Sequence, residues 1–192
     1  MPKFKASNGA FYNLNELEKL NGVEGTASGT GVSAIQGVGL TQVVTFPISA
    51  LNVVMTDATT AGSHGAQKIF TFPEGNVMVL GAVTDLTIAR VGTGLTTTSA
   101  VVGSLGSVTV STADATLTST EANIVPSTAS TLAAGAGVTK GASTAVASLN
   151  GTTTPAAVFL NFATPDAGST ATDALTVNGT ITITYVMLGD SA

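Results

Sequence analysis

The chain has no cysteine, no tryptophan and a single histidine, His64, in 192 residues. Without cysteine it cannot form a disulfide framework, a thiolate metal site or a thiol redox centre. One histidine, with neither a second histidine nor a cysteine to help it, is a weak ligand set for a metal ion. We therefore expect no metal and no cofactor, and we interpret His64 as an exposed or hydrogen-bonded loop residue.

Charged residues are also scarce, because Asp, Glu, Lys and Arg together make up 9% of the chain. The net charge is −5 and the six Lys and Arg are spread over the whole length. They cannot easily form the basic face that phosphate neutralisation requires, so nucleic acid is excluded as a partner. Long apolar runs are missing as well: the longest, Val77–Val83, is far too short to cross a membrane.

The carboxylates are scattered singly, which does not favour an enzyme. Asp57 and Glu74 flank predicted strands near His64, but their spacing does not require the three to meet. Asp166 and Asp173 share a predicted loop without any calcium-binding pattern. The sequence has no G-x-S-x-G nucleophile elbow. We expect no catalytic residue.

One glycine-rich segment, Gly135–Gly141, superficially resembles a phosphate-binding loop. Its third glycine falls one place late for G-x-G-x-x-G, and no Gly-Lys-Ser or Gly-Lys-Thr ends it. It also lacks a following helical pattern, whose first N–H groups would bind the anion. The segment is therefore predicted to be a β-turn or loop.

What the chain does contain is threonine, at 33 positions, and glycine, at 22. Thr and Val pack well on the pleated surface of a sheet. Short alternating segments separated by turn residues predict an all-β fold, an antiparallel, jelly-roll-like β-sandwich over residues 34–192. Strands are predicted at 42–48, 51–56, 67–72, 76–88, 106–111, 115–120, 157–163 and 174–188.

Some details of these segments are left open by the sequence. Gly81 suggests a bulge or bend within its strand, and Pro73–Gly75 is a strong turn signal. Asn178-Gly179 could divide the last strand into a hairpin with a type I′ turn. The Gly-, Ala-, Ser- and Thr-rich segments 92–104 and 126–154 are interpreted as ordered loops or weak strands.

Residues 1–33 differ in character from the rest and are predicted to form an N-terminal arm followed by a Gly/Ser linker at 25–33. Asn13–Glu16 is typical of a helix-capping box, and it predicts a short helix at 14–20. Large apolar side chains are unusually frequent in this arm, so we expect them to be buried on another subunit or on a capsid. They are Phe4, Phe11, Tyr12, Leu14, Leu17 and Leu20.

A polar-aromatic arm before a Thr-, Ala-, Gly- and Val-rich β domain resembles tailed-bacteriophage virion proteins of the head decoration, or cement, class. The stretches that carry the resemblance are Lys68–Gly75, Glu121–Pro126, Val158–Ala163 and Leu175–Ile183. The resemblance implies a jelly-roll or similar sandwich, often a homotrimer, on the capsid exterior of a virion assembled in the host cytoplasm. Its implied partners are the major capsid protein and copies of itself. No functional residue carries over, because interfaces define that class.

The function expected from the sequence is therefore a non-enzymatic structural virion protein that decorates and reinforces a phage capsid. A major capsid or tail-tube protein is one alternative, although helical patterns after residue 24 are scarce. A carbohydrate-binding or adhesin-like sandwich is another, although tryptophan is absent and only two tyrosines are available to stack on sugars.

Overall fold

The computed structural model describes residues 3–5, 11–13, 26–33, 35–36, 41–57, 62–95, 100–111, 117–132, 135–165 and 173–189. Within these ranges the chain is β-structure and connecting segments, with one short 3-10 helix, η1 (Ser119–Glu121), and no α-helix. The strands are β1 (Lys3–Lys5), β2 (Phe11–Asn13), β3 (Thr26–Ala27), β4 (Ile35–Gln36), β5 (Thr41–Val54), β6 (Thr56–Asp57), β7 (Ser63–Thr71), β8 (Asn76–Val91), β9 (Ala100–Gly106), β10 (Val125–Thr131), β11 (Ala136–Ala142), β12 (Ala147–Leu149), β13 (Ala157–Thr164) and β14 (Ala174–Gly189).

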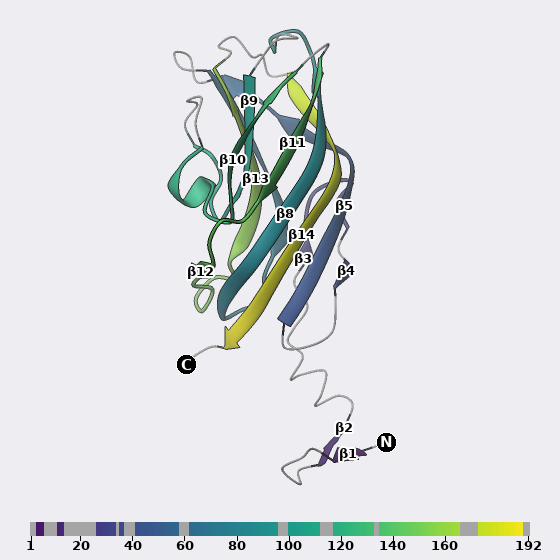
Figure 1. Ribbon diagram of the computed structural model, residues 1–192, viewed down its shortest axis with the longest axis vertical. Helices are drawn as coiled ribbons and strands as arrows, with labels where there is room; N and C mark the ends of the chain where they lie inside the picture. Colours follow the sequence, from purple (N-terminus) through teal and green to yellow (C-terminus); the bar gives the residue numbers. More distant parts are fainter. Residues whose placement is uncertain are drawn as a thin grey trace.

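Two antiparallel sheets pack against each other. The front sheet has the order β11-β8-β14-β5-β4, with β12 pairing to β8, and the back sheet has the order β10-β9-β13-β7-β3, with β6 pairing to β7. In Figure 1 the long strands β8 and β14 cross the front of the molecule, with β9 and β13 behind them. The predicted antiparallel β-sandwich is confirmed.

The connectivity is that of a jelly roll. Among the eight longest strands, the first pairs with the last (β5 with β14), the second with the seventh (β7 with β13), the third with the sixth (β8 with β11) and the fourth with the fifth (β9 with β10). A long hairpin rolled onto itself gives this nested pairing, in which successive long strands lie in opposite sheets except for β9 and β10, which both belong to the back sheet.

The core lies between the sheets and follows the alternation of the strands. On β5 the inward positions are apolar except for Gln42, and the outward positions are mainly Thr, Val, Pro and Ser. Four aromatic side chains form a cluster in the core: Phe70 lies with its ring centroid 5.1 Å from that of Phe46 and 5.0 Å from that of Phe72, and Tyr185 lies 4.9 Å from Phe72. These edge-to-face contacts give a sheet-rich protein with few aromatics a well-packed centre.

The last strand is continuous, so the hairpin alternative at Asn178-Gly179 is wrong. β14 is central in the front sheet and pairs along its length with both β5 and β8. Gly179 has φ 132°, and a Cβ there would lie 2.2 Å from the carbonyl oxygen of Asp85. The glycine thus permits a bulge beside a close backbone contact instead of a turn. Ala50, with φ 52°, forms the matching irregularity in β5 and joins the two strands predicted at 42–48 and 51–56.

The residues expected to be a flexible linker are instead part of the sandwich. We call residues 26–33 and 35–36 the strap. β3 pairs with β7 of the back sheet, Val32 bridges Ile48, and β4 pairs with β5 of the front sheet. The strap thus crosses from one sheet to the other, pairs with part of both edge strands on this side, and satisfies some of the backbone groups that an open edge would leave unpaired.

Of the remaining sequence predictions, a turn and a bulge are confirmed, and three strand or loop assignments are corrected. The turn at Pro73–Gly75 and the bulge at Gly81 are confirmed. Strand β11 occupies the glycine-rich segment that was predicted to be a turn or loop, because Gly137 fits against β10. A Cβ at Gly137 would lie 2.5 Å from Ser130 Oγ. The strands predicted at 106–111 and 115–120 are wrong over residues 107–111 and 117–120, which are irregular or lie in η1, while Gly106 ends β9.

Candidate interaction surfaces

The N-terminal arm contains a two-stranded hairpin. β1 pairs only with β2 among the described strands, and this register places Phe4 opposite Tyr12 and Phe11 opposite Lys5. The hairpin thus brings three of the six predicted contact residues together. Leu14, Leu17 and Leu20, and the helix predicted at 14–20, lie outside the described residues.

His64 is a strand residue near the start of β7, and not a loop residue as predicted. It pairs with Ala163 of β13 on one side and with Thr56 of β6 on the other. Its Nδ1 is buried and has no hydrogen-bond partner in the described part of the chain. Asp57 pairs with the neighbouring Ser63, whereas Glu74 follows the other end of β7, about 30 Å away along an extended strand. The fold therefore separates His64 from Glu74.

Asp173 is fully buried, and its hydrogen bonds hold two segments of the fold together. Its Oδ1 accepts a hydrogen bond of 3.0 Å from the N–H of Gly94, and its backbone oxygen accepts one of 2.9 Å from Met55. The carboxylate thus holds the turn after β8 against the start of β14. Asp166 lies outside the described residues. No group of three or more His, Cys, Asp or Glu that could hold a metal occurs in the described ranges.

Part of the outer face of the back sheet, around β13 and β9, is covered by the chain itself. We call residues 107–111 and 117–124 the flap. Val110 and Leu117 of the flap form a small buried cluster with Ala163 of β13. The flap is also anchored by Asn161, a fully buried side chain of β13 whose three hydrogen bonds all end on flap backbone. This covering is what allows Asn161 to sit in an otherwise apolar strand.

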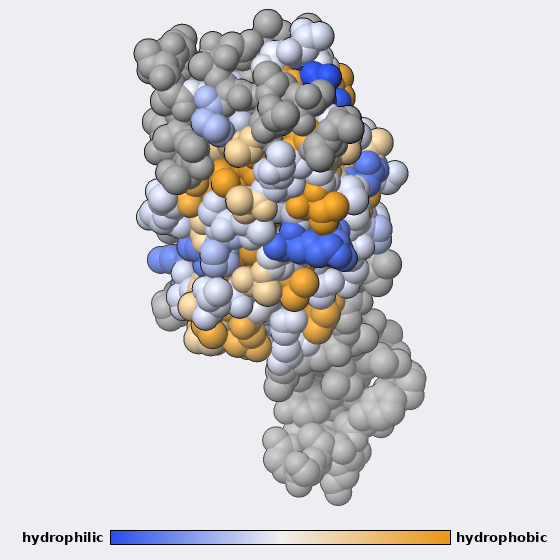
Figure 2. Space-filling view, turned by 45° about the horizontal axis from the view of Figure 1, so that its top comes forward, coloured by the Kyte–Doolittle hydropathy of each residue, from blue (hydrophilic) through white to orange (hydrophobic). Residues whose placement is uncertain are grey.

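The outer face of the front sheet carries no such cover from the described residues. We call the outward side chains of β11, β8, β14 and β5 the front face. It is built from threonines and small residues with five valines that remain 42–55% exposed. These valines are Val43, Val54, Val83, Val91 and Val138. The described surface in Figure 2 is accordingly mostly pale or orange, broken by a few blue patches.

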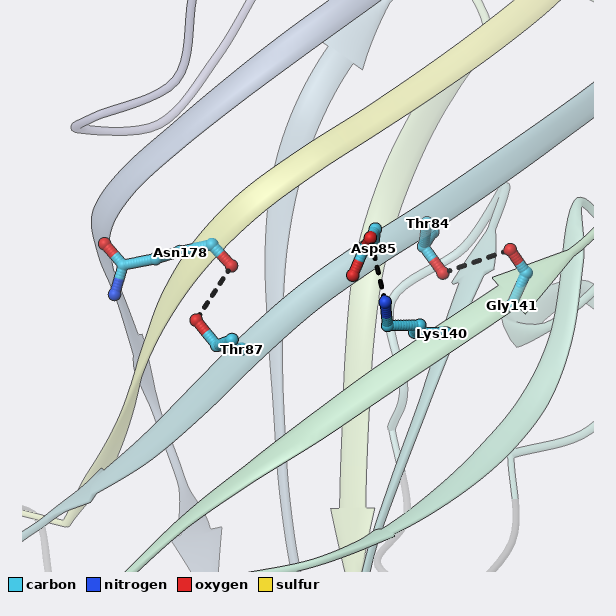
Figure 3. A network of polar contacts seen from close by, with 6 residues as sticks. All are labelled: Thr84, Asp85, Thr87, Lys140, Gly141 and Asn178. Carbon is cyan, nitrogen blue, oxygen red and sulfur yellow. Dashed lines mark hydrogen bonds and ion pairs between the residues drawn. The ribbon is translucent and has the colours of Figure 1, made fainter.

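The front face has one ion pair among its described residues. Lys140 Nζ of β11 donates to Asp85 Oδ2 of β8 at 3.0 Å, and both side chains are more than half exposed. Figure 3 shows this pair between two weaker contacts of 3.4 Å. One joins the exposed Thr87 hydroxyl to the Asn178 carbonyl, and the other joins the Thr84 hydroxyl, which is buried and does not belong to the face, to the Gly141 carbonyl. Thr45 and Thr182 also share a hydroxyl contact of 3.3 Å. The face is thus polar through hydroxyl groups and nearly free of charge.

A shallow cleft lies where the flap meets β12 and the start of β13. Its volume is about 290 Å³ and its lining is neutral: hydroxyl and amide groups of Ser107, Thr120, Asn123, Ser148 and Asn150 surround Leu149, Ala156 and Ala157. The Asn123 amide is already engaged with Ser107 through two hydrogen bonds of 3.0 Å. The lining contains no acid or base that could transfer a proton.

The chain matches no protein-family model, no curated protein and no solved structure. None of the helices in the described ranges has the length and apolar character needed to cross a membrane.

Sequence reasoning missed the front face as a candidate interaction surface. The available signal was the alternation of Thr180, Thr182 and Thr184 with inward isoleucines on β14, together with the absence of Lys and Glu from the outward positions of β5. The strand order, which the sequence did not give, was needed to place these rows side by side.

Proposed function

We propose that this chain is a non-enzymatic structural virion protein that decorates and reinforces a phage capsid from its exterior, through contacts between subunits and with the major capsid protein. The observation that carries the proposal is the contrast between the two outer faces. The flap covers part of the back sheet, whereas the front face is broad, low in charge and bare among the described residues. Such a face suits repeated protein–protein contact better than it suits catalysis.

Jelly-roll connectivity supports the proposal only in part, because viral capsid proteins, lectins and enzymes all use this architecture. The high content of Thr and Val is a second supporting observation. Thr and Val have few rotamers and lose little side-chain entropy when a neighbouring subunit covers them. In this proposal the N-terminal arm attaches the protein to its shell, with the apolar residues of the arm supplying buried surface.

Deletion of residues 1–24 tests the attachment role directly, because it leaves the strap and both sheets intact. We expect the truncated protein to fold and to lose binding to particles in a co-sedimentation assay, since each fully buried anchor contributes about 1.5–3 kcal/mol. Unchanged occupancy on particles would contradict the proposal. His64→Ala tests whether the single histidine is needed for particle binding, and this variant should leave binding intact.

The neutral cleft favours a second candidate, the carbohydrate-binding sandwich. Its hydroxyl and amide groups can exchange hydrogen bonds with sugar hydroxyls, although no aromatic ring lines it for stacking. Saturation-transfer NMR with neutral oligosaccharides tests this function. A signal that disappears in Asn150→Ala would favour it over decoration, and the absence of any signal would exclude it.

A further inference from the structure

We propose that the front face is a self-association surface, on which a second copy of this chain packs face to face. The occupant is another front face, so the complex is a dimer with two-fold symmetry. This inference does not depend on the virion role, because a protein that is absent from particles could still form the dimer.

The edges of the sandwich are partly blocked against association by strand addition. On one side the strap pairs with both β7 and β5. On the other side the edge strands β10 and β11 lie against each other, so closely that a Cβ at Gly141 would lie 2.7 Å from a methyl carbon of Val125. With the edges partly blocked and part of the back sheet under the flap, the front face is a broad described surface that remains for a partner.

The size of the front face matches what a stable interface needs. The ladder between β5 and β14 runs from Thr41 opposite Val186 to Val54 opposite Ala174. With β8 and the shorter β11 alongside, the face measures roughly 45 Å by 17 Å, or on the order of 750 Å². A standard-size interface buries about 800 Å² on each partner.

The electrostatics of the front face also favour a copy of itself. The whole chain carries a net charge of −5, which opposes association. Asp85 and Lys140 compensate each other within one copy, so covering the described face leaves no unpaired charge buried. Lys68 and Glu74 are exposed on β7 and in the turn after it, away from the face, where solvent screens their charges. Asp173 is buried and accepts a hydrogen bond from the Gly94 N–H.

Packing two copies through the same face requires an isologous contact about a two-fold axis. Twisted sheets that pack face to face align within about 30° of each other and interdigitate their side chains. The five exposed valines would then fill spaces between the threonine rows of the partner. The decoration-protein resemblance implies a trimer instead, so the measured mass separates the two arrangements.

The test is the mass of the full chain in solution, measured by sedimentation equilibrium over a range of concentrations. The expected result is a reversible dimer. Val83→Arg and Val43→Arg, on two different strands of the face, should each weaken the dimer about a hundredfold or more, because each buries an unpaired charge at the interface. Val108→Arg is the matched control: Val108 is 46% exposed, against 42% for Val43, but it lies in the flap. Circular dichroism checks that all three variants fold.

A monomer at all concentrations would overturn the inference, as would a trimer. A dimer that both front-face variants leave intact, or that Val108→Arg weakens equally, would also overturn it. If a front-face variant does not fold, Lys140→Glu provides a milder change, since it creates a like-charge pair with Asp85 on an exposed surface. The inference requires that it weaken the dimer, and an unchanged dissociation constant would contradict this.

Discussion

Asn161 is the residue whose replacement most directly tests how the flap is held. Its Oδ1 accepts a hydrogen bond of 3.0 Å from the Val110 N–H, and its Nδ2 donates to the carbonyl oxygens of Val108 at 3.0 Å and Glu121 at 2.8 Å. The side chain is fully buried. Asn161→Leu keeps the size and approximate shape of the side chain while removing all three bonds.

The expected cost follows from the partners that this change leaves behind. The Glu121 carbonyl keeps a hydrogen bond of 2.7 Å from the Ser104 hydroxyl, so it is not orphaned. The N–H of Val110 and the carbonyl of Val108 lose these bonds, and each buried unsatisfied group costs about 1–3 kcal/mol. Because Val108 and Thr109 are already exposed, water can reach part of this segment. We therefore expect a loss of about 3 kcal/mol in the free energy of unfolding.

Urea unfolding followed by circular dichroism measures this loss. For a domain of this size a slope of about 2 kcal/mol per molar urea converts it to a midpoint lower by about 1.5 M. Asn150→Ala is the matched control, since among the described residues the Asn150 side chain bonds only to Thr152, in an exposed turn, and it should cost less than about 1 kcal/mol. Both variants are compared at a concentration that fixes the oligomeric state.

Asn161→Asp adds a second check on the same geometry. One carboxylate oxygen could still accept from Val110, but the other would face two carbonyl oxygens, so this variant should be no more stable than Asn161→Leu at neutral pH. Equal stabilities for Asn161→Leu and the Asn150→Ala control would refute the reasoning. The flap would then be held by its apolar cluster alone.

Two further predictions use matched pairs. Thr139→Val should raise the free energy of unfolding by about 1 kcal/mol, because the Thr139 hydroxyl is buried without a described partner. The control Thr84→Val removes a hydrogen bond to the Gly141 carbonyl and should give no gain, as a comparison of the two thermal unfolding midpoints will show. Gly179→Ala should cost about 2–4 kcal/mol, since the added methyl group would meet the Asp85 carbonyl at a positive φ, whereas Gly81→Ala has open space and should change stability by less than about 1 kcal/mol. Equal effects within either pair would contradict its explanation.

Much of the fold could be predicted from the sequence because the long strands alternate clearly. The inward isoleucines and outward threonines of β14 and the turn at Pro73–Gly75 depend on local chemistry, which a sequence displays directly. Strand β11 was missed because its glycines suggest a turn. These glycines allow β11 to approach β10 closely, and such a contact between residues distant in the sequence is not visible in the segment itself. The strap was missed for the same reason, since a Gly/Ser composition does not reveal pairing with two edge strands.

The candidate surfaces were less predictable than the fold. The importance of Asn161 depends on the flap folding back over β13, and the front face depends on strand order. Both are consequences of long-range pairing, which no single segment encodes. The arm was selected from its composition alone, and its role stays a prediction.

Quantitative mass spectrometry of purified phage particles from cultures that make this chain tests the central proposal most directly. The account predicts that the protein copurifies with intact capsids at a fixed ratio to the major capsid protein, and that protease digests it on the particle exterior while the shell stays closed. Absence of the protein from purified particles, or a trace amount without a fixed ratio, would contradict the account.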